Sequence, residues 1–202
     1  MIAGSVDAST TNGRISGTYS GSTLTLVTTN AVISGTYNAT SLTLKTTNGA
    51  VDVDTTVGRT VTISSSNAHI RGPMSFIGDA RSFDADVHTT NGAIEVRVPT
   101  LPLGAALALD ARTSNAGSGL TLPSTFEGRI WQYTSNSGAP SLVLNLGMRD
   151  PSGRGREYTV QTVENGKRQR EDLVGWGYEP GAGQVRMKTS NGASVVRIVQ
   201  GQ

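Results

Sequence analysis

A four-residue pattern, Thr-Thr-Asn-Gly or a close variant of it, recurs along this chain of 202 residues. Its asparagine occurs at Asn12, Asn30, Asn48, Asn67, Asn91, Asn115, Asn136 and Asn191. The successive intervals are 18, 18, 19, 24, 24, 21 and 55 residues, so the unit is about 18 residues long and the connecting loops lengthen toward the C-terminus. One short unit that recurs in this way is typical of repeat architectures, in which each unit packs on its neighbours.

Hydrophobic and polar residues alternate on both sides of each asparagine. The pairs six and four residues before it are Val6/Ala8, Leu24/Leu26, Leu42/Leu44, Val61/Ile63, Ala85/Val87, Leu109/Ala111 and Val185/Met187. Similar inward pairs follow three and five residues after it, for example Val51/Val53. Alternation of period two predicts two half-buried strands per repeat, and apolar residues do not recur three and four apart as a helix requires.

Strands that repeat at this period can form a β-sandwich or a β-solenoid, and the asparagine favours the solenoid. Equivalent positions of a solenoid stack about 4.8 Å apart, so the amides can form a hydrogen-bonded ladder. A parallel ladder of hydroxyls is expected two residues earlier, at Thr10, Thr28, Thr46, Ser65, Thr89, Thr113, Thr134 and Thr189. Isolated Asn-Gly hairpin turns of a sandwich are the alternative. We therefore predict an all-β fold, a single-stranded β-solenoid (β-helix) of about eight coils with an Asn/Thr ladder, forming one domain over residues 1–202.

Three stretches interrupt the repeat. Residues 71–82 and 99–106 are interpreted as loops between coils, because they contain Gly and Pro. Residues 145–183 are predicted to be an inserted β-hairpin and loop before the final coil, with its turn at Glu164-Asn165-Gly166.

Aromatic residues flank this insertion. Trp176 and Tyr178 are expected to fold back on the last coils and to cover Trp131 and Tyr133, which lie at outward positions. The alternative is an aromatic cleft that binds sugar.

Composition and charge leave the partner open. The net charge is +2, and residues 145–188 mix eight basic with six acidic residues, which we interpret as a solvated surface. No aromatic residues alternate with these charges, so nucleic acid is not an expected partner. The chain has no cysteine, no apolar run of membrane-spanning length and no signal peptide after Met1. Asn38 begins an Asn-Ala-Thr sequon and is a candidate glycosylation site.

One cluster of charged residues is a candidate surface site. The repeat register places Asp84, Asp86, His88, Asp110 and Arg112 within reach of one another on the outward face. Paired carboxylates on such a face suit general acid/base chemistry on polysaccharides or cation binding, whereas a cross-strand ion-pair ladder is the structural interpretation, which we favour. We expect no catalytic residue, metal site or cofactor, because the two histidines have no metal-ligand spacing.

Hydroxyl side chains form a second outward pattern, which comprises Thr23/Thr25, Ser41/Thr43 and Thr60/Thr62. A regular array of threonines suggests an ice-binding solenoid, although threonine is also common on any exposed strand.

The segment from Leu42 to Val53, repeated around Asn91, resembles a family of bacterial domains of unknown function described as adhesins and built as single-stranded β-helices. The segment from Asp150 to Arg156 is similar to the fungal, basidiomycete-like branch of such proteins. The resemblance implies a non-enzymatic, structural or adhesin-like protein of the cell surface or extracellular matrix, with cell-wall polysaccharide as a partner. A carbohydrate-binding or carbohydrate-cleaving β-helix and an ice-binding solenoid are the alternatives.

The two ends of the repeat suggest self-association. Ile2 and Gly4 already occupy inward positions, and the chain stops soon after Val196 and Ile198, so neither end has an evident polar cap. We therefore expect head-to-tail homo-oligomers or fibres, unless the 145–183 insertion folds over the C-terminal end.

Overall fold

The computed structural model describes residues 4–145, 147–177 and 181–200. Its strands are β1 (Ser5–Thr10), β2 (Ile15–Thr28), β3 (Ile33–Lys45), β4 (Val51–Ser64), β5 (Ile70–Phe76), β6 (Ser82–His88), β7 (Ile94–Arg97), β8 (Ala106–Thr113), β9 (Ser118–Pro123), β10 (Gly128–Thr134), β11 (Ser141–Leu144), β12 (Tyr158–Asn165), β13 (Gln169–Trp176), β14 (Gly183–Thr189) and β15 (Ser194–Val199). The described residues contain no helix, and therefore none that could cross a membrane. The prediction of an all-β fold is confirmed.

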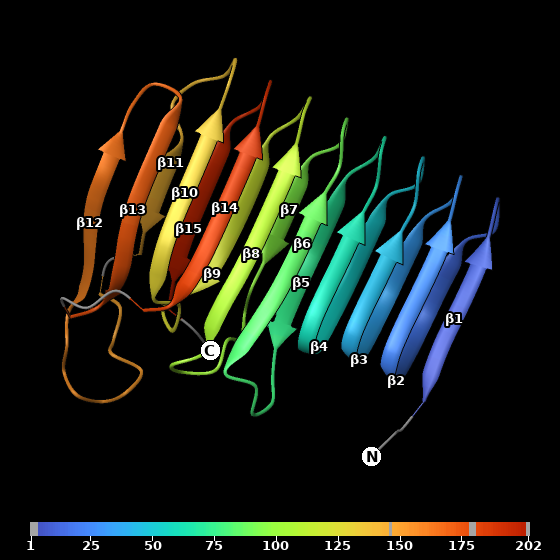
Figure 1. Cartoon of the computed structure of the whole chain (residues 1–202), viewed down its shortest axis with the longest axis horizontal. Coiled ribbons are helices and arrows are strands. Elements are labelled where there is room, and N and C mark those ends of the chain that lie inside the picture. Colours follow the sequence, from blue (N-terminus) through green and yellow to red (C-terminus); the bar gives the residue numbers. More distant parts are fainter. Residues whose placement is uncertain (1–3, 146, 178–180, 201–202) are drawn as a thin grey trace.

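All of these strands belong to one sheet, which curls so that its two arms face each other (Figure 1). The front layer contains β1, the second halves of β2 to β4, and then β6, β8, β14, β10, β13 and β12. The rear layer contains the first halves of β2 to β4, and then β5, β7, β9, β15 and β11. β2, β3 and β4 are long because each of them bends from one layer into the other.

The parallel register follows the repeat. Leu24 pairs with Leu42, which in turn pairs with Val61, so equivalent inward residues stack in columns. The predicted inward pairs from Leu24/Leu26 to Val185/Met187 are buried, and Val6 and Ala8 at the N-terminal end are partly buried. The core is therefore a thin apolar layer between the two arms.

The stacking order differs from the order of the chain. We expected the coils to stack in sequence, with the last one at the end. Instead, β14 lies between β8 and β10, and β15 lies between β9 and β11. The physical reason is that every repeat has the same inward pattern and strand direction, so the last repeat fits between two earlier ones as well as beyond them.

Figure 1 shows a row of turns along the upper edge of the stack, and asparagine side chains join these turns. Each amide nitrogen donates to the amide oxygen of the adjacent turn, at 2.6–2.9 Å. The order along the edge is Asn12, Asn30, Asn48, Asn67, Asn91, Asn115, Asn191 and Asn136. The exchange of the last two positions reflects the insertion of β14 and β15.

The hydroxyls two residues earlier bond to backbone groups rather than to one another. The Thr46 hydroxyl donates to the Ala31 carbonyl at 3.1 Å and accepts from the Gly49 N–H at 3.1 Å. Equivalent donations to the preceding turn come from Thr28, Ser65, Thr89 and Thr113, whereas Thr134 and Thr189 donate to carbonyls of their own turns. These buried side chains therefore satisfy backbone groups of the turns, which would otherwise be unpaired.

The 145–183 insertion contains an antiparallel hairpin, β12–β13, which pairs with the edge of β10. The Trp176 indole is 3% exposed and donates to the Ser124 carbonyl at 2.6 Å. The hairpin lies beside Trp131 and Tyr133 in the sheet, so the expectation that it covers them from above is wrong. Tyr178 lies outside the described residues.

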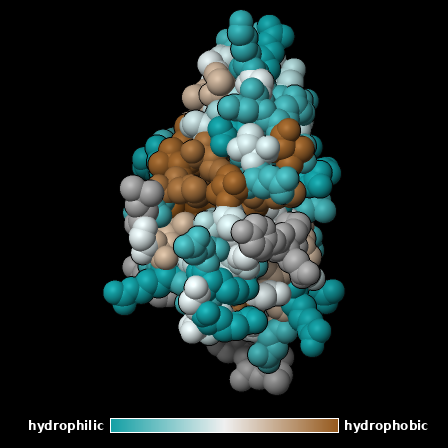
Figure 2. Space-filling model, turned by 90° about the vertical axis from the view of Figure 1, so that its left-hand side faces the viewer, coloured by the Kyte–Doolittle hydropathy of each residue, from teal (hydrophilic) through white to brown (hydrophobic). Residues whose placement is uncertain are grey.

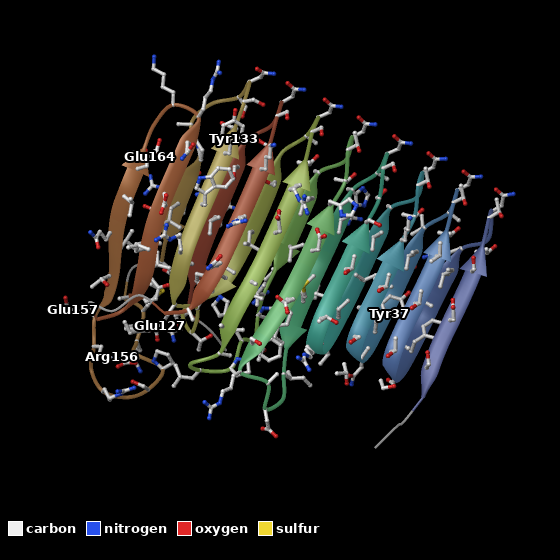
Figure 3. All side chains as sticks on the ribbon, in the orientation of Figure 1. Tyr37, Glu127, Tyr133, Arg156, Glu157 and Glu164 are labelled. Atoms are coloured by element: carbon white, nitrogen blue, oxygen red, sulfur yellow. The ribbon has the colours of Figure 1, made fainter. Side chains whose placement is uncertain are left out.

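We had interpreted the charged residues of this insertion as a solvated surface, but some of them are buried. The Asp172 side chain is fully buried and forms a two-point ion pair with Arg170, at 2.6 and 3.0 Å. In the preceding loop, Asp150 is 2% exposed and accepts hydrogen bonds from Arg156, whose guanidinium also donates to the Trp176 carbonyl at 3.0 Å. These bonds from Arg156 hold the pKa of Asp150 well below its usual value. They attach the loop to the hairpin at the end where Figure 3 labels Arg156 and Glu127.

The prediction of a loop over residues 71–82 is wrong in its first half. Residues 71–76 belong to β5, and only residues 77–81 connect it to β6. Gly72 and Pro73 suggested a loop, but the strand tolerates them because its pairing with β4 is interrupted at these two residues and resumes at Met74.

The end of the stack formed by β11 to β13 shows an apolar patch (Figure 2). Hydrophobic residues at this end that pack on the core without being fully buried are Leu142, Leu144, Met148, Tyr158 and Val160. The hairpin extends the front layer beyond β10, whereas β11 is the last strand of the rear layer. The sequence leaves open whether the 145–183 insertion covers one end of the stack. The hairpin covers this end in the front layer only.

Candidate functional site

The outward face of the front layer brings the predicted surface residues together. Parallel pairing places Thr62, Asp86, Asp110, Arg186 and Trp131 side by side, one on each successive strand. Since adjacent strands are about 4.8 Å apart, this row spans roughly 20 Å across the strands. Ligands that lie along the row would be extended rather than compact.

The acidic cluster forms ion pairs within β6 and within β8, and one ion pair, Arg112–Asp86, joins these neighbouring strands. Arg112 lies 3.0 Å from Asp110 and 3.4 Å from Asp86, and His88 lies 3.5 Å from Asp86. Partial burial raises the pKa of Asp110, an effect that Arg112 opposes and Asp86 strengthens. The cluster borders a hollow of about 430 Å³, which is lined by Asp84, Asp86, Asp110 and Arg112 among others. The arrangement is a network of ion pairs, of which one crosses between strands as the structural interpretation expected.

Metal binding has no support in this cluster. Nowhere in residues 4–145, 147–177 and 181–200 do three His, Cys, Asp or Glu side chains lie close enough to hold a metal ion. The second histidine, His69, is on the other side of the molecule and pairs with Asp52 at 3.0 Å.

The hydroxyl array is in register. Thr23 pairs with Ser41 and Thr25 with Thr43, and the same rows continue to Thr60 and Thr62 on β4. On β6 the rows change to Asp84 and Asp86, so the uncharged array ends at β4.

Trp131 and Tyr133 are two residues apart on β10, so they lie on the same face of the strand. This is the outward face, because Ile130 and Gln132 on the other face are buried. Their rings are nearly parallel, with an interplanar angle of 5° and centroids 5.9 Å apart, and both side chains are partly exposed. Figure 3 shows Tyr133 on the front layer near the turn edge. The pair therefore presents aromatic surface to solvent.

A hollow of about 480 Å³ adjoins Trp131 and is lined by Arg129, Trp131, Glu171, Gln184, Val185 and Arg186. Arg129 and Glu171 form an ion pair of 2.6 Å at its edge. We call this hollow, together with the neighbouring one over Asp84, Asp86 and Asp110, the front trough; Gln184 and Arg186 line both parts.

The residues that surround Trp131 come from distant parts of the chain. Glu171 is placed by the antiparallel pairing of β13 with β10, and Arg186 by the parallel pairing of β14 with β10. Sequence reasoning identified Trp131 but missed Glu171, because it did not pair the hairpin with β10. It also did not place Arg186 beside Asp110, because it put the final repeat at the end of the stack. The alternation of apolar and polar residues in β14 indicates which of its side chains face outward, but it does not indicate which strands lie beside β14.

Comparison with known families adds one result. Residues 6–147 match a family described as a domain of unknown function, DUF7330. The chain belongs to the DUF7330 family. No curated protein and no solved structure matches the chain. The matched part of this DUF7330 protein includes Trp131 and the acidic cluster, whereas β12 to β15 lie beyond it. The front trough is thus built from both parts, and the resemblance to adhesins and to their fungal branch stays a prediction.

The Asn38 sequon lies within β3, and the Asn38 side chain is exposed. A glycan attached there would meet no covering strand, so the position is sterically compatible with modification.

Proposed function

We propose that this DUF7330 protein is a non-enzymatic β-solenoid scaffold that adheres to an extended carbohydrate and acts at the cell surface or in the extracellular matrix. The solenoid interpretation is supported by parallel pairing in which Leu24, Leu42 and Val61 stack in one column. It is also supported by the Asn ladder, which continues over eight turns of the described residues. Such a stack presents rigid, flat faces on which binding groups are held at fixed spacing.

The observation that carries the carbohydrate proposal is the front trough beside Trp131. Aromatic rings bind the apolar faces of sugar rings, and charged groups beside them bind the hydroxyls. Trp131 supplies the ring, and Arg129, Glu171 and Arg186 supply donors and acceptors within the same hollow. The trough crosses the strands, so it suits a linear polymer.

The non-enzymatic part of the proposal is supported by the state of the carboxylates. Asp86 and Asp110 both pair with Arg112, so neither carboxylate is free to act on a bound polymer. A carbohydrate-cleaving β-helix would require one of them to be free for proton transfer.

The test is affinity electrophoresis of the protein in gels that contain neutral polysaccharides. We expect retardation by at least one polymer, and we expect Trp131→Ala to abolish it. Tyr19→Ala, which removes a partly exposed aromatic at the opposite end, is the matched control and should leave retardation unchanged. Equal retardation of wild type and Trp131→Ala would refute this site, and cleavage of the polymer that is lost in Asp86→Asn would refute the non-enzymatic part.

Head-to-tail self-association remains a second proposal for this scaffold. It is supported by the apolar patch at the β11–β12 end, where Leu142, Leu144 and Val160 are incompletely buried. Light scattering over a concentration series tests it: Leu142→Lys should reduce association if this end is an interface, whereas a monomer at every concentration would refute it. The ice-binding alternative rests on the hydroxyl array alone, and thermal-hysteresis measurements on wild type and Thr43→Lys test it.

A further inference from the structure

A separate hollow lies on the opposite side of the molecule from the front trough. It has a volume of about 830 Å³ and lies on the outward face of the rear layer, over β5, β7, β9 and β15. We call it the rear hollow. Its lining includes the small residues Ala93, Gly117, Gly119 and Ala193.

Gly119 keeps this hollow open. The equivalent outward residues on the two neighbouring strands are Glu95 and Val195, so Gly119 interrupts a row of side chains. Its φ angle does not lie in the left-handed region, and the nearest atom to an added Cβ is a carbonyl oxygen at 3.9 Å. Neither backbone conformation nor crowding therefore requires glycine here, and a side chain at this position would project into the hollow.

Arginines line the rear hollow on one side. Arg97 pairs in register with Thr121, which pairs with Arg197, so the two arginines are two strand spacings apart, about 9.6 Å. Both are exposed, and neither has an ion-pair partner within the described part of the chain. A third arginine, Arg71, is already paired with Asp52 at 2.5 Å. Two unpaired guanidinium groups thus face solvent at a fixed separation.

We infer that the rear hollow binds an acidic polysaccharide, a linear sugar polymer with carboxylate groups. Guanidinium groups bind carboxylates through paired, charge-assisted hydrogen bonds, so Arg97 and Arg197 take successive acidic groups of one polymer. The small aliphatic floor accepts the apolar face of a sugar ring, while Glu95 and Thr121 bind its hydroxyls. Nucleic acid fits less well, since no aromatic side chain lines the hollow to stack on bases.

The test uses fluorescence anisotropy with a labelled oligogalacturonate, a carboxylated sugar polymer. Arg97→Gln and Arg197→Gln are each expected to weaken binding about tenfold, because each removes a charge-assisted contact. Gly119→Leu should abolish binding, since it fills the hollow, and its thermal unfolding should match that of wild type. Full methyl esterification of the ligand should also abolish binding, because it removes the carboxylates.

Matched controls exist on the same layer outside the hollow. Arg14→Gln makes the same change of charge, and Ser16→Leu places leucine at the position equivalent to Gly119 on β2. Both should bind like wild type, as should Trp131→Ala, which separates this site from the front trough.

Three results would overturn the inference. One is absence of binding to oligogalacturonate, and another is equal weakening by Arg14→Gln and Arg97→Gln, which indicates general attraction by positive charge. The third is binding of dextran sulfate or oligo-dT that is as tight as binding of oligogalacturonate, which indicates a site for any polyanion. If unfolding shows that Gly119→Leu is destabilised, the arginine variants decide the outcome alone.

Discussion

Replacement of Thr46 by valine is the most informative test of how the turns are held together. The Thr46 side chain is 2% exposed, and its hydroxyl bonds both the Ala31 carbonyl and the Gly49 N–H. Valine keeps the shape and removes both bonds. A buried N–H without an acceptor costs about 1–3 kcal/mol, and loss of the hydroxyl's own bond costs about 0.5–1.5 kcal/mol. We therefore expect Thr46→Val to lower the free energy of unfolding by roughly 2–4 kcal/mol.

Urea unfolding measures this effect, provided that the dependence of unfolding free energy on urea concentration stays constant between variants. Thr47→Val is the matched control, since it makes the same chemical change one residue later, where no side-chain hydrogen bond is recorded. A Thr46→Val protein within about 0.5 kcal/mol of the control would refute the reasoning that these hydroxyls satisfy the backbone of the turns.

Three further changes test other parts of the fold. Gly35→Ala should prevent folding or lower stability by about 3 kcal/mol or more, because the φ angle is 135° and an added Cβ would lie 2.0 Å from a backbone oxygen. The measurement is thermal unfolding followed by circular dichroism. The control Gly138→Ala should melt close to wild type, because an added Cβ there meets open space. Arg170→Leu should lower the free energy of unfolding by about 3–5 kcal/mol in urea titrations, since it leaves the buried Asp172 carboxylate unpaired, and an effect below about 1 kcal/mol would contradict this. Asp150 has a lowered pKa in the folded protein, so its contribution to the free energy of unfolding is complete above the unfolded pKa of about 3.9 and is lost as pH falls further. Melting temperatures from pH 6 to 2 should therefore decrease more steeply for wild type than for Asp150→Asn. Parallel curves for the two proteins would contradict this role of Asp150.

The sequence was sufficient to predict the local structure. Inward pairs such as Leu42/Leu44 and Val61/Ile63 are buried because alternation of period two assigns each side chain to one face of a strand. The hairpin turn near Gly166 was also predictable, since a turn sequence separates two polar, β-rich segments.

The order of stacking was not predictable from that pattern. Val185 and Met187 of β14 have the same spacing as the inward pairs of every other repeat, so the pattern does not specify which neighbours they contact. This order determines the front trough, because it places Arg186 between Asp110 and Trp131. The buried pair of Arg170 and Asp172 was missed for another reason: charged residues are rarely buried unless they are paired, and pairing depends on tertiary contacts.

Three buried aromatic residues at the edge of the stack opposite the asparagine turns were also not predicted. Phe76, Phe83 and Phe126 are fully buried although they lie outside the repeating positions. Phe76 and Phe83 contact each other with ring centroids 5.3 Å apart, on strands that the 77–81 loop connects. Because these aromatic residues lie in or next to connections of different length, the repeat alone does not reveal them.

Tryptophan fluorescence during titration with a polysaccharide that retards the protein tests the carbohydrate proposal most directly. The chain has two tryptophans, of which Trp176 is 3% exposed, so Trp131 is the one that reports contact with a ligand on the surface. We expect a saturable shift of the emission to shorter wavelength, and we expect Trp131→Phe to eliminate it. An unchanged spectrum at saturating ligand, or the same shift in Trp131→Phe, would contradict binding at the front trough.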